Sequence, residues 1–320
     1  MRRAAWMTTI VLAGMSTNAF GFGMSTHAYI AWRVCGTTWP EVLYGSTAPD
    51  FFGMAPSPEI KNAIQPMTHF EFDRLAPAPF SLGFATHNGA WGADHYAHCY
   101  YEPGAPDTYF TARMRQLQDE FGISIYRGED VIEAVLDYMI RRDFGPWWGD
   151  VMARAADSFT STHAQLLVDA FALPLSQRVP GLALEQAQSI VHAMASNYRT
   201  LIRVYGLQLA MQDLPAIRSI LVQGMAAILE TDETTADAIM ARAEVLCEDY
   251  RAELDAIAAS VGDELKTTAY PMPACNAWSL IAAIGAAACA IFRKRRQPGY
   301  LRLTRGPSGV SSIIHPSSAS

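Results

Sequence analysis

From residue 107 onward, apolar residues recur at intervals of three and four positions, and alternating β-branched runs are few. An α-helix turns by about 100° per residue, so this spacing puts the apolar side chains on one face of a helix. Amphipathic stretches are expected over residues 130–142, 151–171, 184–205 and 214–230. A further stripe comprises Ile239, Ala243, Leu246, Tyr250, Leu254, Ile257 and Val261. The pattern predicts an all-α fold, a bundle of helices.

Prolines divide the region before residue 80. They are Pro40, Pro49, Pro56, Pro58, Pro66, Pro77 and Pro79. Because proline disfavours the interior of a helix, we expect short helices and long loops here. The body shows no internal repeat and no firm domain boundary, which favours one helical domain over residues 20–270.

The N-terminus has the composition of a signal peptide. Arg2 and Arg3 precede an apolar run over residues 4–14, and residues 17–19 are the small-residue segment TNA that a signal peptidase reads. We therefore expect residues 1–19 to be removed and the protein to be exported, to the periplasm, the cell surface or the medium.

Near the other end, residues 274–292 carry no charge and are followed directly by the basic cluster 293–296. A span of this length could cross a bilayer as a transmembrane helix, with the basic cluster on the cytoplasmic side. The arrangement resembles the C-terminal sorting tails of some bacterial surface proteins, and a buried or interfacial helix is the alternative. Residues 293–320 then form a basic cluster and a disordered tail.

The charge of the body limits its partners. The net charge is −7, but eight of the 24 basic residues lie in the two end segments, which leaves 16 against 31 acidic residues. A body of about −15 is a poor general binder of nucleic acid, whose phosphates require cations. The five cysteines are scattered without a CxxC pair, which excludes a disulfide-rich scaffold.

Histidines are concentrated in the first part of the body. We expect residues 80–101 to form one helix, on which His87, Asp94 and His98 lie within about 20° of a common face. Two imidazoles and a carboxylate on one face are suitable ligands for zinc. The alternative is an ordinary polar stripe or a hydrogen-bonded His–Asp pair. His95 is expected to point about 80° away from His87, toward an outer contact or the surface.

Three further segments precede this helix: FGMSTH at 22–27, GSTAPD at 45–50 and MTHF at 67–70. Their order resembles the bacterial zinc-dependent phospholipase C family, whose mostly helical fold is shared with zinc-dependent single-strand nucleases. The likeness covers roughly residues 22–102. It implies a cluster of two or three zinc ions with Asp94 as a bridging ligand. The other ligands that it implies are His27, Asp50, His69, His87 and His98.

Three features depart from that family. Its helix reads His-x-x-x-Asp, but Ala90 stands four residues before Asp94, so His87 must substitute from one turn earlier. Phe22 stands near the position where the family often has a mature N-terminal Trp, and His163 is the nearest candidate for a later metal-binding histidine although its acidic neighbours do not have the expected spacing. His192 is expected to be a core histidine rather than a ligand.

The resemblance implies an exported, zinc-dependent phosphodiester hydrolase of the phospholipase C type, in which a metal-activated water attacks phosphorus. Asp50 would bind metal or accept the proton of that water. The expected partners are a phospholipid or another phosphodiester substrate, and a membrane. A single-strand nuclease is one alternative, and a non-catalytic metal-binding surface protein with a decayed site is another.

Overall fold

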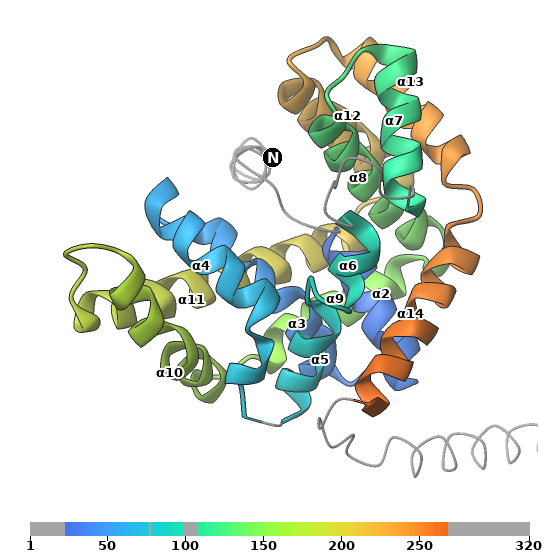
Figure 1. The fold of residues 1–320 in the computed structure, drawn as a ribbon. Coiled ribbons are helices and arrows are strands. Elements are labelled where there is room, and N and C mark those ends of the chain that lie inside the picture. Colours follow the sequence, from blue (N-terminus) through green and yellow to red (C-terminus); the bar gives the residue numbers. More distant parts are fainter. Residues whose placement is uncertain (1–22, 77, 99–107, 268–320) are drawn as a thin grey trace, which may run out of the picture. The chain divides into compact units, whose positions relative to one another are not determined.

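Helices make up the part of the chain that the structure, a computed structural model, describes: residues 23–76, 78–98 and 108–267 (Figure 1). No strand occurs in these segments. The predicted all-α class is therefore confirmed. The expected signal peptide (1–19), the apolar span 274–292 and the tail 293–320 lie outside the described residues. No described helix is both long and apolar enough to span a bilayer.

The helices of the N-terminal part are short, as the prolines predict. Pro40, Pro58 and Pro79 occupy the first positions of α3, α4 and α5, where proline loses no helical hydrogen bond. The elements are α2 (Met24–Cys35), α3 (Pro40–Thr47), the 3₁₀ helix η1 (Ala48–Met54), α4 (Pro58–Phe70), η2 (Phe72–Arg74), α5 (Pro79–His87) and α6 (Ala93–His98).

The remaining helices are longer. They are α7 (Tyr109–Phe121), α8 (Ile125–Phe144), α9 (Pro146–Ser158), α10 (Ser161–Arg178), α11 (Leu184–Met211), α12 (Leu214–Leu229), α13 (Glu233–Leu246) and α14 (Tyr250–Thr267). All described residues belong to one compact unit of the chain.

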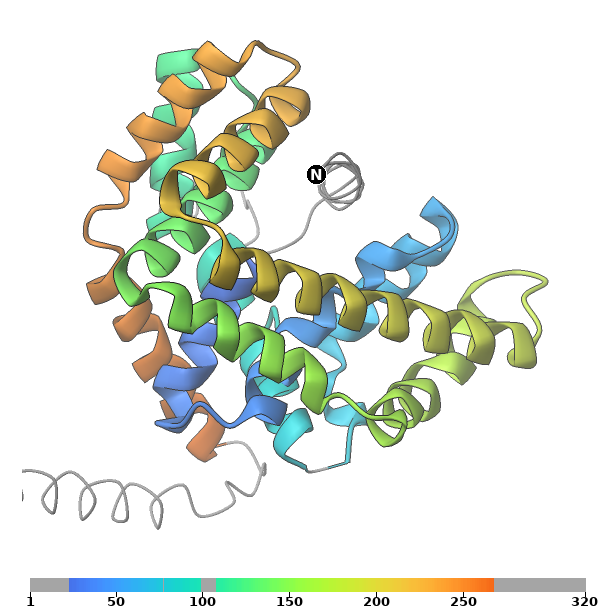
Figure 2. The same ribbon diagram turned by 180° about the vertical axis from the view of Figure 1, so that it is seen from behind.

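Helices α9 and α11 run side by side (Figure 2). Two glycines allow their backbones to touch, because a Cβ on Gly149 would lie 2.2 Å from the backbone nitrogen of Ala210 and one on Gly206 would lie 2.4 Å from that of Ala153. At one end of α11, α10 packs against it, and at the other end the chain continues into α12.

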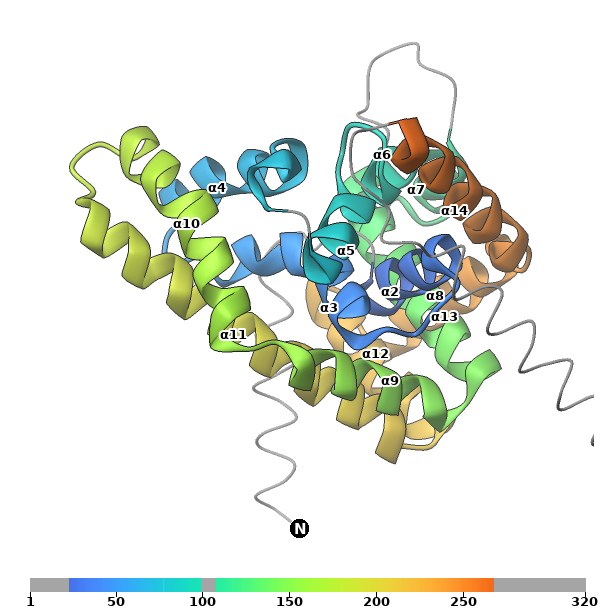
Figure 3. The same cartoon turned by 90° about the horizontal axis from the view of Figure 1, so that it is seen from below.

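Helix α2 packs against α3, α8 and α14, while α3 also packs against α5 and α9 (Figure 3). Helices α7, α8, α12 and α13 form a second group, in which α8 contacts the other three. Within the N-terminal part, α2 thus packs against α8, α3 against α9 and η1 against α11.

Two predicted amphipathic stretches are each interrupted. The stretch 151–171 is divided between α9 and α10, because Thr160 begins a new helix there and its carbonyl accepts the N–H of Ala164. The stripe 239–261 is divided between α13 and α14, and the carbonyl of Asp249 accepts the N–H groups of Ala252 and Glu253 in the first turn of α14. The apolar residues of that stripe are still buried, apart from the partly buried Leu246.

Candidate metal centre

His27 lies in the first turn of α2 and is 1% exposed. Its ring stacks on that of His87, with centroids 3.8 Å apart and an angle of 16° between the planes. Its Nε2 is 3.5 Å from Oδ1 of Asp94. His27 therefore faces the side chains of two other predicted ligands inside the core.

Asp50 lies in η1, one residue after Pro49, and is completely buried. Its Oδ1 is 3.6 Å from Nε2 of His69 and 3.6 Å from Nε2 of His87. Neither carboxylate oxygen has a hydrogen-bond partner among the described residues. A buried carboxylate without hydrogen bonds is costly, so this side chain requires a cation nearby.

His69 lies near the end of α4 and directs its two ring nitrogens to different environments. Nδ1 is 3.1 Å from the carbonyl oxygen of Gln65 and 2.8 Å from Oγ1 of Thr68. Because a carbonyl can only accept, the Gln65 contact places the proton on Nδ1. The lone pair of Nε2 then points toward Asp50 and Asp94.

His87 is the last residue of α5, and its Nδ1 donates to the carbonyl of Ser46 in α3 at 2.8 Å. This bond requires α3 and α5 to be unusually close. A Cβ on Gly45 would lie 2.1 Å from the oxygen of Phe80, and one on Gly83 would lie 2.0 Å from that of Val42. The two glycines therefore allow the carbonyl that orients His87 to reach it.

The expectation of a single helix over residues 80–101 is wrong. Helix α5 ends at His87, and the side-chain oxygen of Asn88 accepts the N–H groups of Ala90, Trp91 and Gly92. Asn88 thus satisfies the backbone of a turn, after which α6 begins at Ala93. Asp94 comes from this separate helix and still reaches His87, with 3.4 Å between Oδ1 and Nε2.

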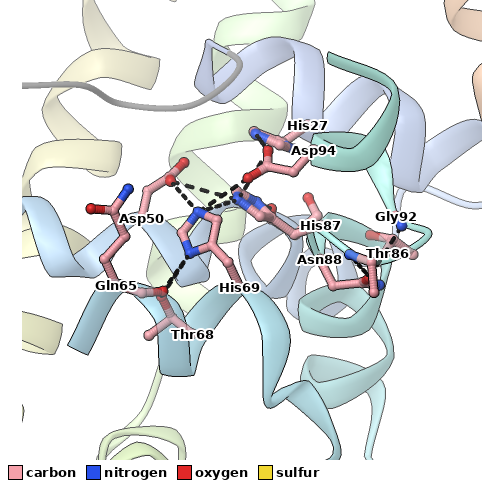
Figure 4. Close-up of polar contacts among 12 residues, drawn as sticks. His27, Asp50, Gln65, Thr68, His69, Thr86, His87, Asn88, Gly92 and Asp94 are labelled. Atoms are coloured by element: carbon pink, nitrogen blue, oxygen red, sulfur yellow. Dashed lines mark hydrogen bonds and ion pairs between the residues drawn. The ribbon is translucent and has the colours of Figure 1, made fainter. Parts of the chain in front are cut away.

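Five buried side chains from five elements converge in this way (Figure 4). Their ligand atoms form two sets, His27 with His87 and Asp94, and Asp50 with His69 and His87. The shortest separations are 3.1 Å from Nε2 of His69 to Oδ2 of Asp94 and 3.3 Å between the Nε2 atoms of His69 and His87. Nitrogen and oxygen ligands around a tetrahedral metal lie about 3.3 Å apart. The site therefore has the donors and the spacing to hold metal ions.

The charges of the site favour a cation. Burial by itself lowers the pKa of His69, but its contacts with Asp50 and Asp94 outweigh that effect and raise the pKa to about 10. Glu133 of α8 is also buried, and both its burial and the neighbouring carboxylates, including Asp50 and Asp94, raise its pKa well above the usual value. The site thus concentrates negative charge that a bound metal would neutralise.

The other predicted site residues lie elsewhere or outside the described part. His98 ends α6, and its side chain is outside the described residues. His163 does not join the cluster, because its Nδ1 accepts the N–H of Thr160 at 3.0 Å and its ring lies against Phe80 and Phe159. The His163 side chain caps the start of α10, and burial lowers the pKa of its imidazole.

Two other histidine expectations have different outcomes. His95 is partly exposed and lies edge-on against Tyr96, apart from both ligand sets, in agreement with the expectation that it points away from them. His192 is exposed on α11, so its prediction as a core histidine is wrong.

Sequence reasoning missed residues that support the ligands. Asn88 precedes Gly89, a pair that signals a turn and could have indicated the end of α5. Asp137 lies in α8 between the buried residues Leu136 and Tyr138, and a buried carboxylate must have a partner. No sequence pattern identifies the carbonyl of Ser46 as a partner of His87, because every residue has a backbone carbonyl.

Comparison with known proteins produced no match, whether to a protein family, a curated protein or a solved structure. The geometry of the site is accordingly the basis of the functional proposal that follows.

Proposed function

We propose that this chain is an exported, zinc-dependent phosphodiester hydrolase of the phospholipase C type. The observation that carries the proposal is the convergence of three imidazole nitrogens and two carboxylates in the core, at the separations of ligands on a shared metal. Stability does not require such a group, because the desolvation of buried charged side chains can cost more free energy than their mutual attraction returns. A function that uses a bound cation explains their presence.

The residues divide naturally between two metal ions. His27 and Oδ1 of Asp94 belong to one set, and Asp50, His69 and Oδ2 of Asp94 lie on the other side. Asp94 can therefore bridge the two ions. His87 is close to both sets and binds one ion through Nε2, since Nδ1 is engaged by Ser46. Neutral imidazole and carboxylate donors suit zinc.

Two bound zinc ions supply an activated water near neutral pH and stabilise charge on the phosphoryl oxygens. The protein's own groups prepare that chemistry. The carbonyls of Gln65 and Ser46 keep His69 and His87 in the tautomer that presents Nε2. Oδ2 of Asp50 has no hydrogen bond among the described residues, so it can accept a proton while Oδ1 faces the histidines.

The net charge of the protein body is the basis for the proposed class of substrate. The strongly acidic body would repel a long polyanion outside the metal cluster, which favours a phospholipid or another small phosphodiester over a polynucleotide. Export and attachment to a membrane are part of the same proposal and rest on the sequences of residues 1–19 and 274–292. Single-strand nuclease activity remains the second candidate, supported by the resemblance of residues 22–102.

The experiment compares Asp94→Ala with His95→Ala in the full chain. Asp94 belongs to a ligand set, whereas its neighbour His95 belongs to neither, so the pair is matched for position on α6. Zinc content is measured by elemental analysis, and hydrolysis is measured on phosphatidylcholine and on single-stranded nucleic acid. We expect two or three zinc ions and lipid hydrolysis in the wild type and in His95→Ala. Asp94→Ala should lose at least one zinc and nearly all activity.

Each other result has a defined meaning. Hydrolysis of nucleic acid alone would replace the lipid substrate by the nuclease alternative. Bound zinc without cleavage of any diester would support the alternative of a non-catalytic metal-binding protein. A folded, zinc-supplied wild type without metal would refute the metal site itself.

A further inference from the structure

The first turn of α2, which carries His27, is held by side chains from two other helices. Gly23 precedes this helix and has no side chain to cap it. Instead, Asp137 of α8 accepts the N–H of Ser25 at 3.1 Å through Oδ2 and the N–H of Thr26 at 2.9 Å through Oδ1. Oγ1 of Thr26 also donates to Oδ1 at 2.9 Å. A carboxylate in this place satisfies the N–H of Ser25, and it is a second acceptor for the N–H of Thr26, which also donates to the carbonyl of Gly23 at 2.8 Å.

Tyr205 of α11 holds Asp137 from the other side. Its hydroxyl donates a short hydrogen bond to Oδ2 of Asp137 and lies 2.8 Å from Oγ of Ser25. The tyrosine therefore contacts both the carboxylate and the turn that the carboxylate holds. Three helices are joined at this point, although α8 and α11 contribute none of the converging ligand atoms.

The carboxylate of Asp137 lies directly against the backbone of Gly23. A Cβ on Gly23 would lie only 2.3 Å from the carboxyl carbon and Oδ1 of Asp137. Asp137 itself is 7% exposed. The carboxylate is thus packed directly beneath the backbone that leads into the His27 turn, and a shift of its position would move that turn.

His27 differs in this respect from the other two imidazoles of the cluster. His69 and His87 are oriented by carbonyls of α4 and α3, through Gln65 and Ser46. His27 directly follows Thr26, whose N–H and hydroxyl both bind Asp137. Its place beside Asp94 and His87 therefore depends on the contact between α2 and α8.

We propose that Asp137, held by Tyr205, is a positioning residue for His27 and controls binding of the metal that His27 would share with Asp94 and His87. This inference rests on the proposed function, because it presumes that the cluster binds metal. Asp137 does not bind the metal in this proposal. The metal on the side of Asp50 and His69 should be affected much less, because its ligands come from η1 and α4.

The test measures zinc binding rather than activity. Metal-free full-length protein is titrated with Zn²⁺ against a chromophoric chelator, and the two affinities are determined for Tyr205→Phe and Asp137→Asn. Loss of an outer partner of a metal ligand typically weakens binding by about 10–100-fold. We expect a loss of this size for one of the two zinc ions, while the affinity for the other stays within about threefold.

A matched pair of controls is available on the same helix. Tyr250 of α14 donates its hydroxyl to Asp143 of α8 at 2.8 Å, so Tyr250→Phe and Asp143→Asn break a similar Tyr–Asp contact that does not bind the first turn of α2. These variants should bind both zinc ions like the wild type. Urea unfolding of all four variants shows whether the changes in stability are comparable, so a general loss of stability is separated from a loss of positioning.

Tyr205→Phe removes only a hydroxyl group from a partly exposed side chain, so it tests the idea even if Asp137→Asn does not fold. Wild-type affinities for both zinc ions in Tyr205→Phe would overturn this inference and leave the proposed function standing. An equal loss in Tyr250→Phe would overturn it too. A wild type that binds fewer than two zinc ions would overturn the two-metal proposal, and this inference with it.

Discussion

At the scale of single residues, His69 and His87 are the most informative residues of the site. Nδ1 of His69 and Nδ1 of His87 both donate to carbonyls, so in their neutral forms both Nε2 atoms carry lone pairs at a separation of 3.3 Å. Carboxylate oxygens of Asp50 and Asp94 lie beside them. Such a group of acceptors is stable only around a proton or a metal ion. In the metal-free protein the proton resides on His69, whose pKa is raised to about 10.

Metal binding should therefore release a proton from His69. Below pH 10 the metal-free site holds this proton, and a metal must displace it because the ligand is the neutral imidazole. We expect release of about one proton at pH 7–8 and an apparent zinc affinity that rises by about tenfold per pH unit. Calorimetric titration in two buffers of different ionisation enthalpy measures the release. Zinc binding without proton release would contradict this account, and His192→Ala, which changes an exposed histidine, should behave like the wild type.

The same pKa shift affects the metal-free fold. A histidine whose pKa is raised on folding stabilises the folded state fully below the unfolded value of about 6.5, and this contribution disappears as pH rises through about 10. Without metal, the protein should consequently become less stable across this range.

At the scale of the elements, the contact between α3 and α5 connects chain packing with the site. Gly45 and Gly83 remove the side chains that would separate the two helices, and this closeness lets the carbonyl of Ser46 bind His87. Glycine in a helix costs about 0.5–1 kcal/mol relative to alanine. Here the contact between α3 and α5 offsets that cost. Asp50 lies in η1, the element that follows α3.

Gly83→Ala should therefore destabilise the protein and weaken zinc binding together. The new Cβ would lie 2.0 Å from the backbone oxygen of Val42, and overpacking of this kind costs about 1–3 kcal/mol. Gly262→Ala is the control, because a Cβ there would meet only Val34 at 3.9 Å. It should stabilise α14 by about 0.5–1 kcal/mol and leave zinc affinity unchanged. Urea unfolding and zinc titration measure both effects, and equal behaviour of the two variants would refute the role of the α3–α5 contact.

At the scale of the whole molecule, the ligands join segments that are separated in the chain. They come from α2, η1, α4, α5 and α6. Helices α2, η1 and α5 pack against α3, while α4 packs against η1 and α6 against α5 in the folded state. The unfolded chain does not bring these ligands together, so zinc should bind the folded state selectively. Binding of this kind stabilises a protein by an amount that depends on metal concentration.

Removal of metal should accordingly lower the melting temperature. Zinc at about 100 times its Kd contributes about 2.7 kcal/mol, which corresponds to a shift of about 5–10 °C for a chain of this size. Thermal unfolding with added zinc and with a chelator measures the shift. Asp94→Ala, which loses at least one zinc, should show a smaller difference between the two conditions than the wild type. A wild type that melts at the same temperature in both would contradict a shared metal site.

The sequence by itself determined the helical class, because apolar spacing within a helix is a local property that each segment carries on its own. It also determined that the helices before residue 80 are short, since proline disfavours the helix interior through its own backbone. Residues His27, Asp50, His69, His87 and Asp94 could be selected from the order of their motifs. The order of the motifs indicated the set of candidate ligands but not the distances between their side chains.

Only the tertiary structure decided how His87 and Asp94 approach each other. The expected helix through both residues is replaced by a turn around Asn88, and two separate helices bring the side chains to 3.4 Å. Packing likewise assigned His163 to the start of α10 and Asp137 to the first turn of α2. Hydrophobic periodicity indicates which face of a helix is buried. The distances between helices depend instead on backbone contacts such as those at Gly45 and Gly83. These contacts form only when distant segments of the chain pack together.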